Sequence, residues 1–257
     1  MIVLVTGATG VLGRRVVSFL AGRAHAVRAM SRSGTMVVEE AQAVRGDLIT
    51  GEGVPDAVDG VDAIVHCASD PQRHQQLDRA GTARLIDIAL RSGKPHFLLP
   101  GIVGSDLIPY SYYQSKLAAE SRLAASGLPW TIIRATQFHQ LIWHVLEKKS
   151  RRPLVVVPNE TRFQVLDPSQ VAERLALSVE EGPAGRLPDM GGPFAYAASD
   201  LARSYLTATG KKRMLVKPNY PGLVWAAFRA GANLTPNRAA GETWNDFVAR
   251  QASRLRT

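Results

Sequence analysis

The chain lacks several features that mark specialised classes of protein. Its 257 residues include a single cysteine, Cys67, which excludes an internal disulfide framework and is typical of a reducing compartment. No apolar run approaches the roughly 18 residues that a membrane-spanning helix needs. The N-terminus becomes apolar at once, with no basic segment before Gly7, unlike a secretory signal peptide. We therefore expect a soluble, cytoplasmic protein with no membrane partner.

Two catalytic chemistries also lack their sequence signals. Histidine, cysteine and carboxylate residues do not occur at metal-ligand spacing, so no metal is expected. No G-x-S-x-G elbow indicates a Ser–His–Asp hydrolase. The net charge of +9 is compatible with a nucleic-acid partner, but the arginines are scattered along the chain. One tight basic cluster is formed by Lys148, Lys149, Arg151 and Arg152. Solvated surface charge is the favoured interpretation, and nucleic acid is a disfavoured partner.

Apolar runs alternate with segments of helical spacing over the first half of the chain. The strands predicted from these runs cover 2–6, 26–30, 42–45, 62–67, 96–99 and 130–134. The helices predicted between them cover 11–22, 78–91 and 111–126. Strands that alternate with helices pair in parallel and carry helices on both faces. The pattern predicts an α/β fold with a Rossmann-type doubly wound sheet, in which ligands bind beyond the carboxyl ends of the strands.

The alternation weakens after residue 150, where prolines separate short segments. Asp167 and Pro168 predict the N-cap and first position of a helix that continues to about 180. Further helices are expected near 199–209 and 243–253, the last beginning at Thr243. We expect a Rossmann domain over 1–150 and a smaller, irregular C-terminal part over 151–257. This part would pack over the ligand edge as one continuous structural unit with the domain.

A glycine-rich stretch, TGATGVLG, lies between the first strand and the first helix. Gly7 permits a tight turn, Gly10 lets the backbone approach a pyrophosphate, and Gly13 lets the helix lie close to the strand. The helix N-terminus offers free N–H groups and the positive end of its dipole to the phosphates. A dinucleotide site is predicted at this turn. Its residues would be Thr6, Gly7, Ala8, Thr9, Gly10, Val11, Leu12 and Gly13.

The end of the second strand indicates which dinucleotide binds. A cofactor without a 2′-phosphate is usually held there by an acidic residue, and none is present. Ser31, Arg32 and Ser33 offer a guanidinium and hydroxyls, which suit a phosphate. NADP(H) is therefore favoured over NAD(H), although Arg32 could also be an ordinary loop charge. Asp47, followed by Leu48 after the third strand, could accept a hydrogen bond from the adenine amino group or cap a helix.

These motifs and a Tyr-x-x-x-Lys pair resemble the short-chain dehydrogenases/reductases. The stretches that resemble their atypical, NmrA-like branch are GIVGSD (101–106), YYQSKLAAE (112–120), SGLPWTIIRATQFH (126–139) and AGANLTPNRAAGETW (230–244). The resemblance covers essentially the whole chain and implies NADP(H) binding by a Rossmann-type domain with a small C-terminal substrate region. Members include reductases and non-catalytic sensors or regulators. The resemblance also implies cofactor contacts from Ala68, Ser69, Ala135, Thr136 and Phe138.

Tyr112 is the one tyrosine of the stretch YSYYQSK that has a lysine four positions later. Tyr112 and Lys116 share one face of a helix, and an ammonium beside a phenol favours its ionised form. Tyr112 would donate a proton to a carbonyl oxygen while hydride arrives from the nicotinamide, and Lys116 could bond the ribose hydroxyls. The alternative is an ordinary Tyr/Lys pair on the surface of an amphipathic helix.

The serine or threonine that helps to polarise the carbonyl in short-chain reductases is missing. The matching place after the fifth strand holds Pro100 and Gly101, and the loss of such a donor typically costs about 10²–10³ in rate. Ser105, Ser69 or a backbone N–H near Gly101 could replace it. The sequence leaves these alternatives open.

The predicted substrate pocket is the least specific part of the site. Its candidates are Gly101, Ser105, Phe138, His139, Trp143 and Phe163. The aromatic residues are also explained as core, and His139 is either a structural histidine or a proton relay. Two functions follow. The favoured one is an NADPH-dependent oxidoreductase acting on a small apolar carbonyl, quinone or imine, and the alternative is a non-catalytic NADP(H)-binding redox sensor or regulator.

Overall fold

The computed structural model describes residues 1–36 and 38–255, and the chain divides into two compact units. The first unit consists of residues 1–101, 110–134 and 168–188. The second consists of residues 102–109 and 135–167 together with the chain from 189 onward. The sequence predicts one boundary near residue 150, with one part before it and one part after it. In the structure each unit instead consists of several segments that alternate along the chain. This alternation arises because a later segment returns to complete the central sheet.

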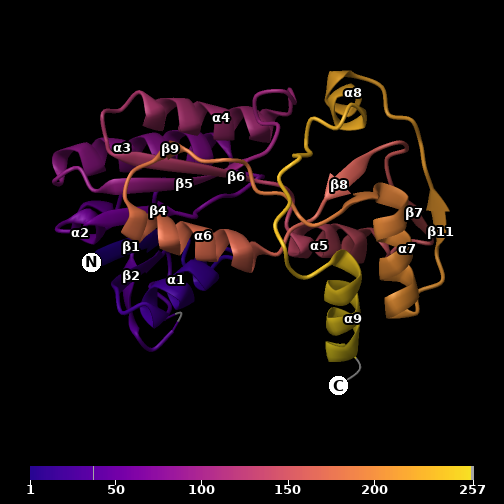
Figure 1. Ribbon diagram of the computed structural model, residues 1–257, viewed down its shortest axis with the longest axis horizontal. Coiled ribbons are helices and arrows are strands. Elements are labelled where there is room, and N and C mark those ends of the chain that lie inside the picture. Colours follow the sequence, from indigo (N-terminus) through magenta and orange to yellow (C-terminus); the bar gives the residue numbers. More distant parts are fainter. Residues whose placement is uncertain (37, 256–257) are drawn as a thin grey trace. The chain divides into compact units, whose positions relative to one another are not determined.

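A seven-stranded sheet forms the centre of the first unit (Figure 1). Its strands are β1 (Ile2–Thr6), β2 (Ala26–Ser31), β3 (Ala41–Arg45), β4 (Ala63–His66), β5 (His96–Ile102), β6 (Trp130–Ala135) and β9 (Gly185–Arg186). Their order is β3-β2-β1-β4-β5-β6-β9. β1 pairs in parallel with both β2 and β4, so the strand order reverses beside β1. The predicted doubly wound α/β fold is confirmed.

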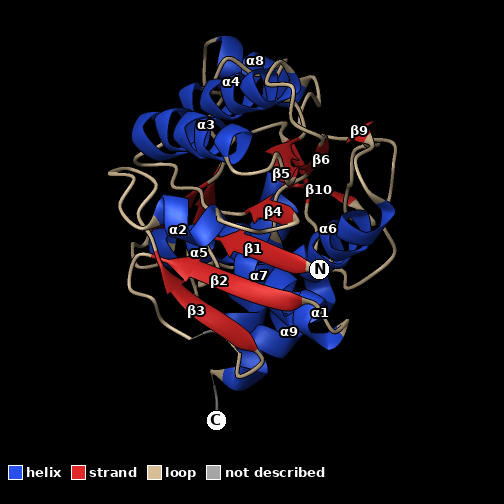
Figure 2. Ribbon diagram, turned by 90° about the vertical axis from the view of Figure 1, so that its left-hand side faces the viewer, coloured by secondary structure: helices blue, strands red, loops and turns tan. Residues whose placement is uncertain are grey.

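Helices cover both faces of this sheet (Figure 2). They are α1 (Gly13–Gly22), α2 (Val54–Val58), η1 (Gln75–Gly81), α3 (Thr82–Arg91), α4 (Ser111–Ala124) and α6 (Pro168–Glu181). α1 and α6 lie on one face, and α3 and α4 lie on the other. The core contains buried strand residues such as Leu4, Ile64 and Phe97, together with helix residues such as Leu85 and Leu123. Because β1 and β4 are covered on both faces, they are continuous apolar runs in the sequence.

The helix predicted over 78–91 has a different beginning from the one expected. Its first part is the π-helix η1, and the regular helix α3 starts only at Thr82. A π-helix has a wider turn than an α-helix and is often found at functional sites. Asp78 lies within η1 and is only 1% exposed, so this irregular turn carries a buried carboxylate.

The second unit contains short helices and two small sheets. Its elements are α5 (His139–Lys149), β7 (Leu154–Val156), β8 (Arg162–Gln164), β10 (Ala195–Ala197), α7 (Ala198–Thr209), β11 (Met214–Val216), α8 (Leu223–Arg229) and α9 (Trp244–Arg254). β10 pairs with β8 in antiparallel and β11 with β7 in parallel. Tyr205, Trp244 and Phe247 dominate its core. The predicted start of the last helix at Thr243 is confirmed by a capping box with Asp246.

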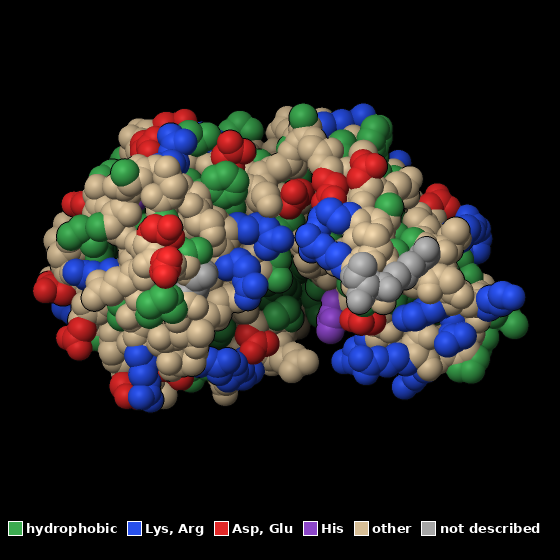
Figure 3. Space-filling view, turned by 90° about the horizontal axis from the view of Figure 1, so that it is seen from below, with side chains coloured by type: hydrophobic (Ala, Val, Ile, Leu, Met, Phe, Trp, Pro, Cys, Tyr) green, Lys and Arg blue, Asp and Glu red, His purple; other side chains and the backbone are tan. Residues whose placement is uncertain are grey.

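Figure 3 shows Lys and Arg side chains at several separate places on the visible face of the molecule. None of the helices in the described ranges combines the length and the apolar character that crossing a bilayer requires.

Candidate functional site

The turn between β1 and α1 has backbone geometry that only small residues allow. Gly7 has a φ of +63°, in the left-handed region, and a Cβ there would lie 2.6 Å from the Cα of Ala68. A Cβ on Gly13 would collide with the carbonyl oxygen of Gly7. Leu12, at the N-cap of α1, has no oxygen to cap the helix. The N–H groups of Arg14, Arg15 and Val16 bond the carbonyl oxygens of Gly10 and Leu12, so what the turn offers an anion is an open approach to the positive end of the α1 dipole.

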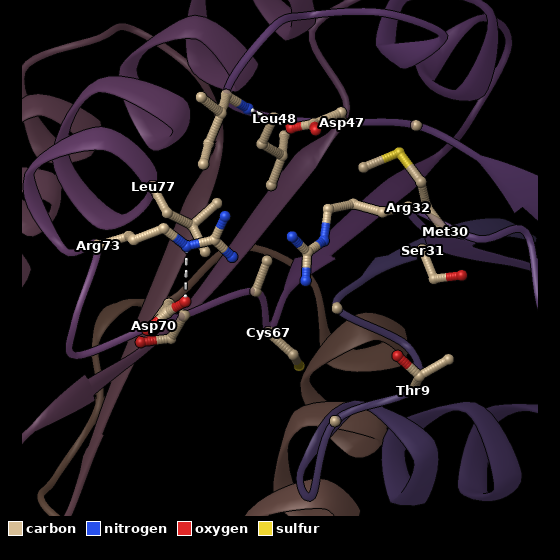
Figure 4. Close-up of a pocket in the computed structure, with 16 residues that line it drawn as sticks. Thr9, Met30, Ser31, Arg32, Asp47, Leu48, Cys67, Asp70, Arg73 and Leu77 are labelled. Carbon is tan, nitrogen blue, oxygen red and sulfur yellow. Dashed lines mark hydrogen bonds and ion pairs between the residues drawn. The ribbon is translucent and has the colours of Figure 1, made fainter.

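A pocket of about 200 Å³ opens beside this turn, within the first unit (Figure 4). It lies where β1 to β4 end, which is the crevice in which doubly wound sheets bind their ligands. Four loops line it, and their lining residues are Gly7, Thr9, Gly10, Met30, Ser31, Arg32, Gly46, Asp47, Leu48, Ile49, Cys67, Ala68, Ser69, Asp70, Arg73 and Leu77. The structure thus brings together predicted cofactor residues from the ends of four strands.

Two arginines point into this pocket from different loops. Figure 4 shows the guanidinium groups of Arg32 and Arg73 facing each other across it. Arg73 Nε donates a hydrogen bond to Asp70 Oδ2 at 2.9 Å, and this bond lowers the pKa of the Asp70 carboxyl. The sequence reasoning missed Arg73, because its loop carries no recognisable motif. Two guanidinium groups make the pocket suitable for an anionic ligand.

The other residues predicted near the second and third strands differ in their contacts. Asp47 Oδ1 accepts a hydrogen bond from the Ile49 N–H at 2.7 Å, so Asp47 caps a turn and no helix starts there. Leu48 lines the pocket and is buried. Ser31 also lines the pocket, whereas the hydroxyl of Ser33 is 2.5 Å from that of Thr35, outside the lining set.

The predicted pair Tyr112 and Lys116 is joined to two further side chains. Tyr112 Oη lies 2.8 Å from Ser69 Oγ, and Ser69 Oγ donates to Asp78 Oδ1 at 2.5 Å. Lys116 Nζ lies 3.3 Å from the same carboxylate oxygen, and the side chains of Lys116 and Asp78 are 9% and 0% exposed. Because Ser69 also lines the pocket, this network adjoins it. Asp78 was missed, since its burial depends on the irregular turn of η1.

Burial and charge act in opposite directions on Lys116. Burial alone would lower its pKa, but the negative charges that Tyr112, Asp78 and Glu120 carry when they are ionised raise the pKa above its ordinary value. Lys116 is therefore an ammonium at neutral pH. Burial and the positive charge of Lys116 together lower the pKa of His66 to about 3.

His66 is a neutral structural residue, in agreement with its place inside a strand. Its Nδ1 lies 2.7 Å from Thr6 Oγ1 and its Nε2 lies 2.9 Å from Thr82 Oγ1. Thr6 Oγ1 also accepts a hydrogen bond from the Ala68 N–H at 3.3 Å. The Thr6 side chain therefore links β1 to the end of β4 and holds the residues after β4 next to the turn.

The structure explains why a serine is missing at Gly101. A Cβ on Gly101 would collide with the carboxylate of Glu120 and lie 2.9 Å from Arg134 Cγ. Glu120 and Arg134 form a buried ion pair, with 2.7 Å between Arg134 Nη2 and Glu120 Oε2. Burial raises the pKa of Glu120, and Arg134 partly offsets this effect. A serine side chain would fit here only if Glu120 or Arg134 shifted, which disfavours a polarising hydroxyl at this position.

The remaining predicted residues belong to the second unit. Ala135 forms a bridge with Met190, and Thr136 Oγ1 accepts a hydrogen bond from the Gly192 N–H at 3.4 Å. Ser105 is buried on the segment 102–109. All three thus lie in contacts inside their own unit.

The aromatic candidates pack within the second unit. Phe138 precedes α5 and bridges to Leu166. His139 is fully buried, its ring centroid lies 5.0 Å from that of Phe247, and burial lowers its pKa. The two remaining rings contact other aromatic residues: Trp143 lies 4.8 Å from Tyr205, and Phe163 lies 5.9 Å from Phe228. The described residues contain no group of three histidine, cysteine or carboxylate side chains that could hold a metal.

Comparison with known proteins identifies the fold family. Residues 7–166 match the family profile described as NAD(P)H-binding. The chain belongs to this NAD(P)H-binding family. The matched range starts at the first glycine of the turn and includes every residue that lines the pocket. The resemblance to atypical, NmrA-like short-chain dehydrogenases/reductases is confirmed at the level of fold and cofactor class.

Relatives within the NAD(P)H-binding fold differ in what they do. The photosystem II assembly factor Ycf39 of Trieres chinensis is 25% identical over 184 residues, which are 67% of this chain and 58% of that protein. The chain thus spans less than two thirds of that relative's length. An NADPH-dependent quinone oxidoreductase of Escherichia coli, solved with NADPH, has a TM-score of 0.78 at 15% identity and covers 99% of this chain and 100% of its own. A nucleoside-diphosphate-sugar epimerase of Staphylococcus aureus has a TM-score of 0.77 at 16% identity, covering 97% and 100%.

Proposed function

We propose that this protein is an NADPH-dependent oxidoreductase that transfers hydride to a small apolar carbonyl, quinone or imine. The observation that carries the proposal is the position of Tyr112 Oη. It lies 2.8 Å from a hydroxyl that lines the pocket, on the same helix face as the buried ammonium of Lys116. An exposed Tyr/Lys pair on an ordinary amphipathic helix would not have these contacts.

The first unit fits a dinucleotide on its own geometry. The β1–α1 turn would hold the pyrophosphate, because its glycines let the backbone approach the phosphates and no side chain caps α1. Arg32 would bind the 2′-phosphate of NADP(H), with Arg73 facing it across the pocket. Asp47 and Leu48 would lie beside the adenine. No carboxylate stands among Ser31, Arg32 and Ser33, which favours NADP(H) over NAD(H).

Tyr112, Lys116 and Ser69 would together supply a proton to the substrate. A reduced nicotinamide supplies the hydride when it is bound. Tyr112 would donate its proton to the oxygen or nitrogen that gains negative charge. Lys116, held as an ammonium, would fix the local charge and bond the ribose hydroxyls. Ser69 Oγ contacts Tyr112 Oη but donates its hydrogen to Asp78, so Ser69 would orient the Tyr112 hydroxyl rather than polarise the substrate.

A non-catalytic role is the second candidate function, and one observation favours it. The place of the polarising serine is filled by the Glu120–Arg134 ion pair, so the usual set of short-chain reductase side chains cannot assemble there. The relative Ycf39 is named as an assembly factor, which favours a role other than turnover. In this case the pocket would bind the cofactor without turnover.

The experiment that separates the two functions follows NADPH oxidation across a panel of quinones, aldehydes, ketones and imines. Tyr112→Phe is the test variant, and Tyr110→Phe, a partly exposed tyrosine two positions away, is the matched control. Turnover that is lost in Tyr112→Phe and retained in Tyr110→Phe, with NADPH binding intact in both, supports the reductase. Normal turnover in Tyr112→Phe refutes Tyr112 as the acid. Tight NADPH binding without turnover on any acceptor supports the sensor.

A further inference from the structure

One of the two hydrogen bonds of the Ser69 hydroxyl has a fixed direction. Ser69 has one hydroxyl hydrogen, and it is donated to Asp78 Oδ1 at 2.5 Å. Toward Tyr112 Oη, at 2.8 Å, Ser69 can therefore only accept. The hydrogen of that bond must come from Tyr112. This arrangement requires Tyr112 to be a neutral phenol, with its proton directed at Ser69.

Asp78 is fixed in position by its other contacts. Its Oδ2 accepts a hydrogen bond from the Asp70 N–H at 3.1 Å, and its Oδ1 receives the Ser69 hydroxyl. The same Oδ1 lies 3.3 Å from Lys116 Nζ, and the Asp78 side chain has no exposure to solvent. The carboxylate thus lies next to the ammonium that was expected to ionise Tyr112.

The charges that face Tyr112 and Lys116 come from three segments. Asp78 lies on η1, and Glu120 on α4 adds a second negative charge near Lys116. The His74 ring centroid lies 6.2 Å from that of Tyr112, and its Nδ1 lies 2.8 Å from Ser115 Oγ. The other titratable groups nearby, on β4 and the loop after it, are His66, Cys67 and Asp70. Glu120 is itself paired with Arg134, so Asp78 is the carboxylate that opposes the charge of Lys116 at Tyr112.

We propose that Asp78 is a positioning residue that keeps Tyr112 protonated at neutral pH, so that the site is arranged to donate a proton and to work in the reductive direction. Without substrate, Ser69 accepts the hydrogen bond that the Tyr112 hydroxyl donates. When substrate binds, its oxygen replaces Ser69 as the acceptor. This inference rests on the proposed function. It differs from a site in which lysine alone ionises the tyrosine, because that site is equally suited to remove a proton from an alcohol.

The proton step balances as follows for a carbonyl substrate. The O–H bond of Tyr112 breaks, and a new O–H bond forms on the substrate oxygen as the carbonyl carbon gains hydride from a reduced nicotinamide, which is oxidised. The product is an alcohol, and Tyr112 is left as a phenolate. Ser69 then turns its hydrogen from Asp78 toward the phenolate, and water returns the proton to Tyr112.

The test measures ionisation of Tyr112 without cofactor or substrate. The near-ultraviolet absorbance of phenolate is recorded from about pH 8 to 11, around the ordinary tyrosine range, and Tyr112→Phe is subtracted to isolate Tyr112. The same pair is measured in the Asp78→Asn background. Asp87→Asn is the matched control, since Asp87 is an exposed carboxylate on α3 that pairs with Arg122. At a fixed pH below the midpoint we expect about tenfold more Tyr112 phenolate in Asp78→Asn and no change in Asp87→Asn.

Two results would overturn the inference. The first is unchanged or reduced Tyr112 phenolate in Asp78→Asn. The second is a Tyr112 that is already ionised at neutral pH in the parent protein, a measurement that stands even if Asp78→Asn does not fold.

This measurement also separates the inference from the proposed function. If no acceptor is turned over, the proposed function fails, while the absorbance still decides whether Asp78 holds Tyr112 protonated. If turnover is found, Asp78→Asn should lose the reductive rate at a lower pH than the parent and gain rate in alcohol oxidation at neutral pH. A pH profile of Asp78→Asn that coincides with the parent contradicts the inference but leaves the reductase intact.

Discussion

Restoring the missing serine should damage the protein rather than improve it. In Gly101→Ser the new Cβ would occupy the space of the Glu120 carboxylate and lie 2.9 Å from Arg134 Cγ. Overpacking of this kind costs about 1–3 kcal/mol. If the serine also separates Glu120 from Arg134, the uncompensated buried charge costs about 3–5 kcal/mol. We therefore expect a loss of at least about 1 kcal/mol, and more if the ion pair breaks.

Urea and thermal unfolding measure this loss directly. For a chain of this size, each 1 kcal/mol lowers Tm by about 2–4 °C. Gly22→Ser is the matched control, because Gly22 ends α1 in the same unit and a Cβ there meets nothing within 4 Å. The control should unfold within about 0.5 kcal/mol of the parent. If Gly101→Ser is as stable as the control, Glu120 does not fill the serine's place, and the absence of serine needs another explanation.

Three further predictions concern single side chains of the first unit. His66 has a pKa of about 3 in the folded protein, so between about pH 3 and 6.5 it binds fewer protons there than in the unfolded chain. The free energy of unfolding should therefore decrease as the pH is lowered through this window, by at most about 1.4 kcal/mol per pH unit. Urea unfolding at pH 7 and 5.5 should show a larger loss in the parent than in His66→Gln, and equal losses would contradict this. Arg32→Glu should weaken NADPH binding at least about tenfold more than NADH binding, with Arg91→Glu on α3 as the charge-reversal control; equal weakening of both cofactors would remove the 2′-phosphate assignment. Desolvation raises the pKa of Cys67 to about 12, so alkylation near pH 8 should be roughly 10³-fold slower in the native protein than in urea, and similar rates would refute the raised pKa.

Local patterns determined much of this protein. The strand at 2–6 has the bounds that its apolar run predicts, because a strand buried on both faces needs an unbroken run. The turn at Gly7 requires φ above zero, which glycine supplies at no steric cost. Thr243 and Pro168 start α9 and α6 where capping and N-terminal proline preferences place them. Each of these features depends on residues that are close in the sequence, so it can be predicted from the sequence alone.

The placement of buried charge was decided by the tertiary structure. Ser69 and Tyr112 are 43 positions apart and meet only because η1 and α4 pack beside the end of β4. Asp78 looks like any helix carboxylate in the sequence, yet the π-turn carries it inward to Lys116. The sequence reveals that Gly101 has no hydroxyl, but the reason is the Glu120–Arg134 pair beside it. Such contacts depend on which distant side chains share a small volume, and no local period or spacing encodes that.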